Sequence, residues 1–183
     1  AIQPEAIFIG HGHFDHAADA GYVAGLSNAL LIAGSNVCDI ARERAASEGI
    51  PNTFPCLNLG DQTNPGAGSV RAIQIWEDVE PVHVVQHTHS AAEPADLLSG
   101  GMPLVYIPDV LTFPTYLNTS LAEALRFVGT LRDDGGVGQP AGGTWAYHFR
   151  AGDFAWFWHN STGVMKAGNA ESEAVANALT NLP

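Results

Sequence analysis

The sequence predicts a mixed α/β domain from three observations: the order of its apolar segments, its composition and its length. A short apolar run, a helix-like stretch and a second apolar run follow one another within residues 1–33, which is typical of a βαβ unit. Hydrophobic residues make up 46% of the chain and charged residues 14%, a balance typical of packed globular proteins. At 183 residues, we expect one domain spanning 1–183.

The first part of the chain predicts strands and helices in alternation. Apolar runs that end at Gly or lie between prolines indicate buried strands, and longer stretches with one apolar face indicate helices. These signals predict a strand at Ile7–Ile9, a helix beginning at Ala17, a strand at Ala29–Ala33, a helix at Asn36–Gly49 and a short strand at Cys56–Leu59.

The second part predicts mostly antiparallel strands around a long loop. Period-two alternation and short turns indicate strands at Val70–Ile75 and Val82–Gln86, and a hairpin of Trp145–Arg150 with Phe154–His159. Four prolines favour a covering loop at Ala91–Tyr116, followed by a helix at Leu121–Leu131 and a glycine-rich connection at Asp134–Gly143. A last helix is expected at Glu171–Leu179.

Charge and apolar run length exclude two classes of partner. Seven Lys and Arg against 19 Asp and Glu leave a net charge of -12, which repels nucleic acid. No run approaches the roughly 20 apolar residues of a membrane span, so we expect a soluble protein. Cys38 and Cys56 either pair or stay reduced, and they do not decide between cytoplasm and export.

A polar cluster follows the first predicted strand and precedes a helix. It contains His11, His13, Asp15 and His16 within six residues. Strand ends of α/β sheets present side chains into a crevice, and imidazole with carboxylate suits zinc, with iron or manganese as alternatives. Residues two apart in an extended loop point the same way, so His11 and His13 are expected on one metal, and Asp15 and His16 on a second.

This HGHFDH segment resembles the HxHxDH signature of the metallo-β-lactamase superfamily. The resemblance implies an αββα sandwich and one or two zinc ions, one of them bound by the first two histidines and a distant third. It also implies several further strands ahead of the HGHFDH segment, which this sequence lacks, and a strand after residue 183, so we expect a partial domain. A homo-oligomer or another covering partner would bury the sheet edge and apolar face left uncovered.

The resemblance places two further ligands downstream. The third histidine ends a strand in such proteins, and either His87 or His89 fits; a following Ser favours His89. His83, inside the strand, is expected to be a core or surface residue. Asn160 stands where the family carries a bridging Asp, which leaves open one metal, a rearranged second site that includes His159, or an inactive variant.

The hairpin adds side chains that could line such a site. Alternating faces are expected to place two of its four largest aromatic side chains in the core and two beside the site. These side chains are Trp145, Tyr147, Trp156 and Trp158. His148 and Arg150 form a pair able to bind a carboxylate, but we expect them to face solvent.

The expected chemistry is metal-assisted hydrolysis. Zinc lowers the pKa of a water molecule to near 7, and Asp15 would be the catalytic residue that orients this water or accepts its proton. We expect a small-molecule substrate with an ester, lactone or amide bond. The alternative from another class is a non-catalytic metal-binding protein of the same family. In that case Asn160, in place of the bridging Asp, would indicate the loss of catalysis.

Overall fold

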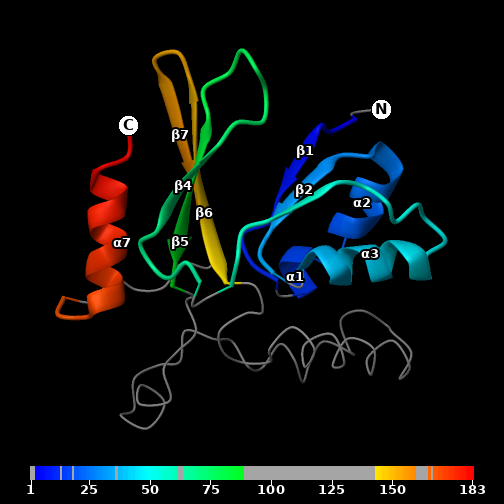
Figure 1. Cartoon of the computed structure of the whole chain (residues 1–183), viewed down its shortest axis with the longest axis horizontal. Coiled ribbons are helices and arrows are strands. Elements are labelled where there is room, and N and C mark those ends of the chain that lie inside the picture. Colours follow the sequence, from blue (N-terminus) through cyan, green and yellow to red (C-terminus); the bar gives the residue numbers. More distant parts are fainter. Residues whose placement is uncertain are drawn as a thin grey trace, which may run out of the picture.

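The chain forms one parallel and one antiparallel sheet that lie face to face, with helices outside them (Figure 1). The computed structural model describes residues 3–12, 14–17, 19–35, 37–61, 64–88, 143–159, 165 and 167–183, and only the backbone of Phe14 and Asp15. From one side to the other, the layers are α7, the antiparallel sheet, the parallel sheet, and the helices α2 and α3 (Figure 1). The class is therefore mixed α/β.

The parallel sheet has the order β1-β2-β3. Its strands are β1 (Ala6–Phe8), β2 (Leu30–Ala33) and β3 (Cys56–Asn58). The continuous apolar sequence of β2 follows from its position, because a central parallel strand is buried on both faces. Helices α1 (Phe14–Ala17), α2 (Ala20–Ser27) and α3 (Val37–Ser47) connect these strands.

The antiparallel sheet has the order β4-β5-β6-β7. Its strands are β4 (Val70–Ile73), β5 (Val82–His87), β6 (Thr144–Ala151) and β7 (Phe154–Trp158). Helix α7 (Ala170–Thr180) packs near β5, and its N-cap Asn169 accepts a hydrogen bond from the backbone N–H of Ser172 at 2.9 Å. These ranges and those of the parallel sheet confirm the predicted elements that fall on described residues, with one exception. The helix expected to begin at Ala17 is instead two helices, α1 ending at Ala17 and α2 beginning at Ala20.

Two apolar clusters hold the layers together. Helices α2 and α3 cover one face of the parallel sheet with small residues, and they approach closely at Gly21, where a Cβ atom would lie 2.0 Å from the carbonyl oxygen of Ala41. The other face of this sheet packs on the antiparallel sheet through larger side chains, among them Ile32, Trp145 and Tyr147. The site described below lies at one end of this second interface.

Cys38 of α3 and Cys56 of β3 form a disulfide, which settles the alternatives that the sequence left open. The bond ties the second helix to the third strand of the parallel half. Both cysteines of the chain are used in this bond.

Two predictions for the hairpin are wrong. The register places Tyr147 opposite Trp158 and Phe149 opposite Trp156, so Trp145, Tyr147, Trp156 and Trp158 share one face and do not divide between two. His148 is 7% exposed and therefore does not face solvent, although Arg150 is half-buried.

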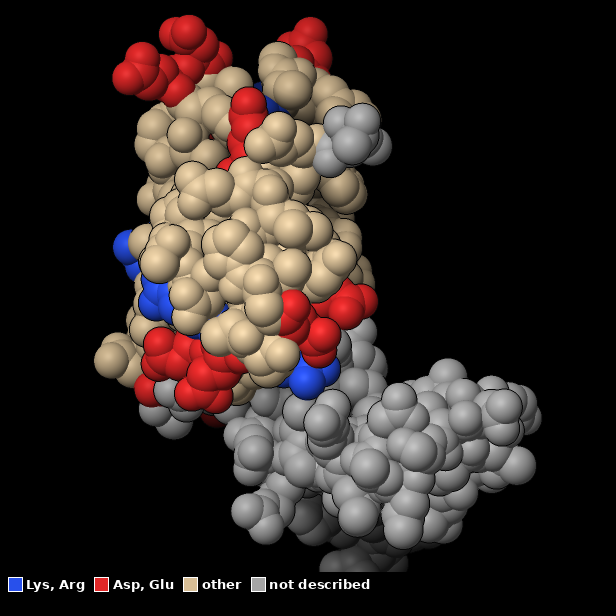
Figure 2. Space-filling model, turned by 90° about the vertical axis from the view of Figure 1, so that its right-hand side faces the viewer, with Lys and Arg blue, Asp and Glu red and all other residues tan. Residues whose placement is uncertain are grey.

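The predictions for Ala91–Tyr116, Leu121–Leu131 and Asp134–Gly143 lie outside the described residues, Gly143 excepted. Among the residues that are described, no helix is long and apolar enough to cross a membrane. Figure 2 shows the face that carries α2 and α3, on which more acidic than basic side chains are visible.

Candidate metal centre

The end of β1 is held by both sheets. The backbone N–H of Ile9 donates to the carbonyl oxygen of Ile32 in the parallel sheet at 2.9 Å. From the antiparallel sheet, the N–H of Trp145 donates to the carbonyl oxygen of Gly10 at 2.7 Å, and the Tyr147 hydroxyl donates to that of Ile9 at 2.7 Å. The segment that leads into the histidine cluster is therefore anchored one residue before His11.

His11 and His16 lie together after this anchor. His11 is only 1% exposed, whereas His16, on the short helix α1, is exposed. Their ring centroids are 4.1 Å apart with 45° between the planes. The turn between β1 and α1 therefore brings two imidazoles of the HGHFDH segment into one small volume, one buried and one facing solvent.

His87 reaches the same edge from the antiparallel sheet. It ends β5, is 4% exposed, and lies opposite Thr144, whose chain neighbour Trp145 contacts Gly10. Its Nδ1 atom lies 2.9 Å from the carbonyl oxygen of Thr88. Because a carbonyl oxygen can only accept, Nδ1 carries the proton, and Nε2 keeps a lone pair that can bind a metal.

The surroundings of His87 favour its neutral form. Burial lowers the pKa of His87 most, and nearby His159 lowers it further, whereas the bond to the Thr88 carbonyl acts in the opposite direction. A neutral imidazole is the form that binds metal ions. Burial and tautomer together give His87 the properties of a metal ligand.

His159 follows β7 at the same edge of the sheet. Strands β5 and β7 both run antiparallel to β6, so their last residues lie at one edge, near the end of β1 (Figure 1). The ring of His159 lies 5.8 Å from that of Phe157, measured between centroids. Three strand ends thus bring histidines to one region.

Part of the predicted ligand set lies outside the described residues. This holds for His13, His89 and Asn160, and for the side chain of Asp15. Among the side chains that are described, no group of three or more His, Cys, Asp or Glu residues could hold a metal ion. The described histidines therefore form partial sets, one on each sheet.

Donor chemistry of these partial sets fits zinc. His11 and His87 are buried imidazoles, and imidazole nitrogen is a preferred zinc ligand. His87 also has its remaining ring nitrogen fixed by a backbone carbonyl, an arrangement common among zinc-bound histidines.

Tyr147 is the residue whose role at this site the sequence did not reveal. It is fully buried, and burial raises the pKa of its hydroxyl, which therefore stays protonated and donates to Ile9. Its ring packs edge-on against Phe8 of β1, with 5.1 Å between centroids. An aromatic residue in the middle of a strand predicts burial, but no local signal points to a partner 138 positions away.

Comparison of the chain with protein-family models, with curated proteins and with solved structures gave no match.

Proposed function

We propose that the chain is a zinc-dependent hydrolase of the metallo-β-lactamase type, with its centre at the edge where β1, β5 and β7 end. One observation carries the proposal: the HGHFDH segment and a buried histidine at the end of a second-sheet strand reach the same edge. The order of layers, helix, sheet, sheet and helix, supports the corresponding αββα fold.

The proposal gives each ligand a place. His11, His13 and His87 would hold the first zinc, with His89 as the alternative third ligand, and Asp15 and His16 would hold a second zinc where one binds. His87 is preferred to His89 because of its burial and the proton position set by Thr88. His159 is the described side chain that could complete the second position in place of an acidic residue, since it lies near His87.

Bound zinc would supply Lewis acidity, making a water molecule acidic enough to attack an ester or amide carbon near neutral pH. The residues of the chain would do the rest. Asp15 would orient the water and accept its proton, and the short, doubly anchored end of β1 would keep His11 in position. The substrate class proposed is a small ester, lactone or amide.

A second candidate is a non-catalytic zinc-binding protein of the same type. It is favoured by Asn160, because a neutral amide bridges two cations far less well than a carboxylate. Both candidates require zinc binding at the same edge, and they differ only in turnover.

The test is zinc affinity of matched histidine variants, measured by competition with a chromogenic chelator. His11→Ala and His87→Ala are expected to weaken zinc binding at least about 100-fold, because each removes a ligand. His83→Ala is the matched control, since His83 lies on β5 four residues before His87 and is expected to leave the affinity unchanged. Circular dichroism confirms that each variant is folded.

Equal zinc affinity in all four proteins would contradict the metal centre. With zinc loaded, hydrolysis of lactone, ester, amide, thioester or phosphodiester substrates that stops with chelator supports the hydrolase. Tight zinc binding without turnover of any of these supports the non-catalytic candidate. His89→Ala, measured beside His87→Ala, decides which of the two is the third ligand.

A further inference from the structure

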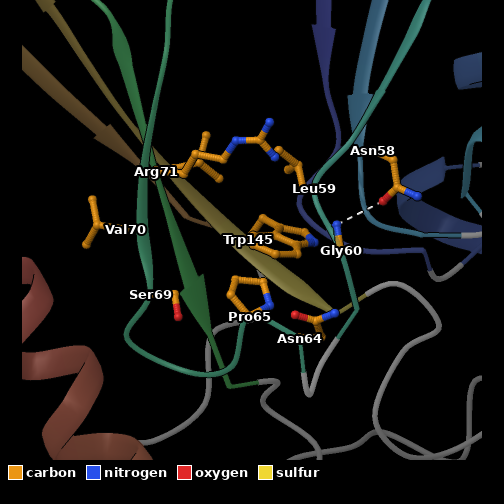
Figure 3. A pocket seen from close by; sticks show the side chains of 10 residues that line it. Asn58, Leu59, Gly60, Asn64, Pro65, Ser69, Val70, Arg71 and Trp145 are labelled. Carbon is orange, nitrogen blue, oxygen red and sulfur yellow. Dashed lines mark hydrogen bonds between the residues drawn. The ribbon is translucent and has the colours of Figure 1, made fainter.

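A pocket of about 650 Å³ opens between the two sheets, beside β3 and β4 (Figure 3). The indole of Trp145 lies at its centre, directed toward Gly60, and Pro65 lies next to it. Leu59 and Val84 add apolar surface from the two sheets. The pocket therefore offers one wall made mainly of apolar side chains.

Arg71 supplies the positive charge of this pocket. Its side chain extends from β4 across the gap between the sheets, and its guanidinium lies close to Leu59 (Figure 3). Arg71 is exposed, and within the described part of the chain its guanidinium has no hydrogen-bond or ion-pair partner. No described residue therefore occupies its five N–H groups, which can donate to a ligand.

Acidic groups are missing from the lining that the structure describes. None of the described residues that line the pocket is Asp or Glu. Asp61, the acidic residue nearest in sequence, uses one carboxylate oxygen to accept a hydrogen bond from the backbone N–H of Asn64 at 2.9 Å. In a chain of net charge -12, an arginine in such surroundings creates a local preference for anions.

A second pocket gives the comparison. It has a volume of about 420 Å³ and contains Arg44, but its lining also includes Asp19 and Glu48. The two carboxylates outweigh the single guanidinium there. Arg71 and Arg44 are thus two arginines in pockets of opposite net charge, which makes Arg44 a suitable control.

We propose that the Arg71 pocket binds a small molecule that combines an apolar ring or chain with a carboxylate. The guanidinium of Arg71 holds the carboxylate through two parallel N–H···O bonds, and the apolar part lies against Trp145 and its neighbours. The pocket adjoins the candidate metal centre through Trp145, which is bonded to Gly10. Binding here does not depend on zinc.

The experiment is an NMR titration of ¹⁵N-labelled protein that has been stripped of metal and then freed of chelator. Phenylacetate is the probe, and 2-phenylethanol is its uncharged partner of similar shape. We expect phenylacetate to shift the Trp145 indole N–H signal and to bind about tenfold more tightly than 2-phenylethanol, because only phenylacetate engages the guanidinium.

Variants separate charge from shape. Arg71→Gln is expected to abolish the preference for phenylacetate, and Arg71→Lys to retain only part of it, since an ammonium group cannot make the paired bonds. Arg44→Gln is expected to leave the preference unchanged. Both positions, Arg71 and Arg44, carry pocket-lining side chains, and the Trp145 signal itself reports that the fold is intact.

Four outcomes would overturn the proposal. The first three are equal affinity for phenylacetate and 2-phenylethanol, persistence of the preference in Arg71→Gln, and absence of a shift at Trp145 up to saturating probe. Acetate alone binding as tightly as phenylacetate would also overturn it, because the apolar wall would then contribute nothing. None of these results bears on zinc affinity, so the failure of this proposal is distinct from that of the metal centre.

Discussion

The parallel half of the molecule packs small residues locally, whereas the antiparallel half packs large residues across long sequence separations. In the parallel half, Ala20, Ala24 and Ala41 lie between α2, α3 and the sheet, and a disulfide spans 18 residues. In the antiparallel half, β5 and β6 pair across the segment 88–143, and Trp145 and Tyr147 fill the interface.

The two halves contribute different parts of the candidate centre. The parallel half presents His11 on the short connection after β1, a position that follows from the local βαβ order. The antiparallel half contributes His87 and also holds the end of β1 through Trp145 and Tyr147. Each half thus carries part of the site, and the bonds from Tyr147 and Trp145 join the halves.

The largest expected effect comes from removing the contact between the two halves at Tyr147. Tyr147→Ala removes a fully buried ring and its bond to Ile9, and should lower the free energy of unfolding by about 3–5 kcal/mol. Tyr147→Phe keeps the ring and removes only the donor, so a loss of about 1–2 kcal/mol is expected. Urea unfolding followed by circular dichroism measures both.

Trp156→Ala is the matched control for Tyr147. Trp156 lies on the same face of the sheet but is 53% exposed, and we expect its removal to cost less than about 1 kcal/mol. Equal losses of unfolding free energy for Tyr147→Ala and Trp156→Ala would mean that the contact of Tyr147 with the parallel half does not stabilise the fold.

An intermediate effect is expected from the disulfide, which lies wholly in the parallel half. The Cys38→Ala and Cys56→Ala double variant should lose about 2–4 kcal/mol of unfolding free energy, because the unfolded chain is no longer constrained. None of the four tryptophans belongs to the strands or helices of the parallel half: Trp145, Trp156 and Trp158 lie on β6 and β7, and Trp76 lies between β4 and β5. Native tryptophan emission should therefore stay unchanged, and a shifted emission maximum would show that the halves are not separable in this way.

The smallest effect concerns His148 in the antiparallel half. Burial lowers the pKa of His148 most, and the nearby charges of His83 and Arg150 lower it further. The ordinary pKa of histidine is 6.5. Below this pH, His148 takes up a proton in the unfolded state but not in the folded state, so the free energy of unfolding should fall as the pH drops through this value. Above it, His148 has no such effect.

Urea midpoints at pH 7.5 and pH 5.5 test this sign. His148→Gln should show a smaller drop between the two pH values than the unchanged protein does. Part of the drop should remain, since the pKa of His87 is lowered as well. His148 is buried, and its Nδ1 atom has no hydrogen-bond partner among the described residues. An identical drop in both proteins would show that protonation of His148 does not cause the loss of stability in acid.

Local signals in the sequence were sufficient to predict the elements of both halves. Apolar runs ending at Gly10 and Gly34 mark β1 and β2, because buried parallel strands must be apolar on both faces. The same signals placed the HGHFDH segment directly after a strand, although its last three residues lie in α1 and not before a helix. The metallo-β-lactamase resemblance, the zinc and the hydrolysis that it implies remain predictions.

Contacts between distant segments could not be read in this way, because no local pattern specifies register or partner. The pairing of Tyr147 with Trp158 placed the aromatic side chains on one face, against the expected division. Cys38 and Cys56 are bonded because α3 packs beside β3, and His87 approaches His159 because β5 and β7 point the same way. The sequence by itself determined which segments become strands and helices and where His11 lies. The tertiary structure decided which side chains meet there, since burial and packing depend on residues far apart along the chain.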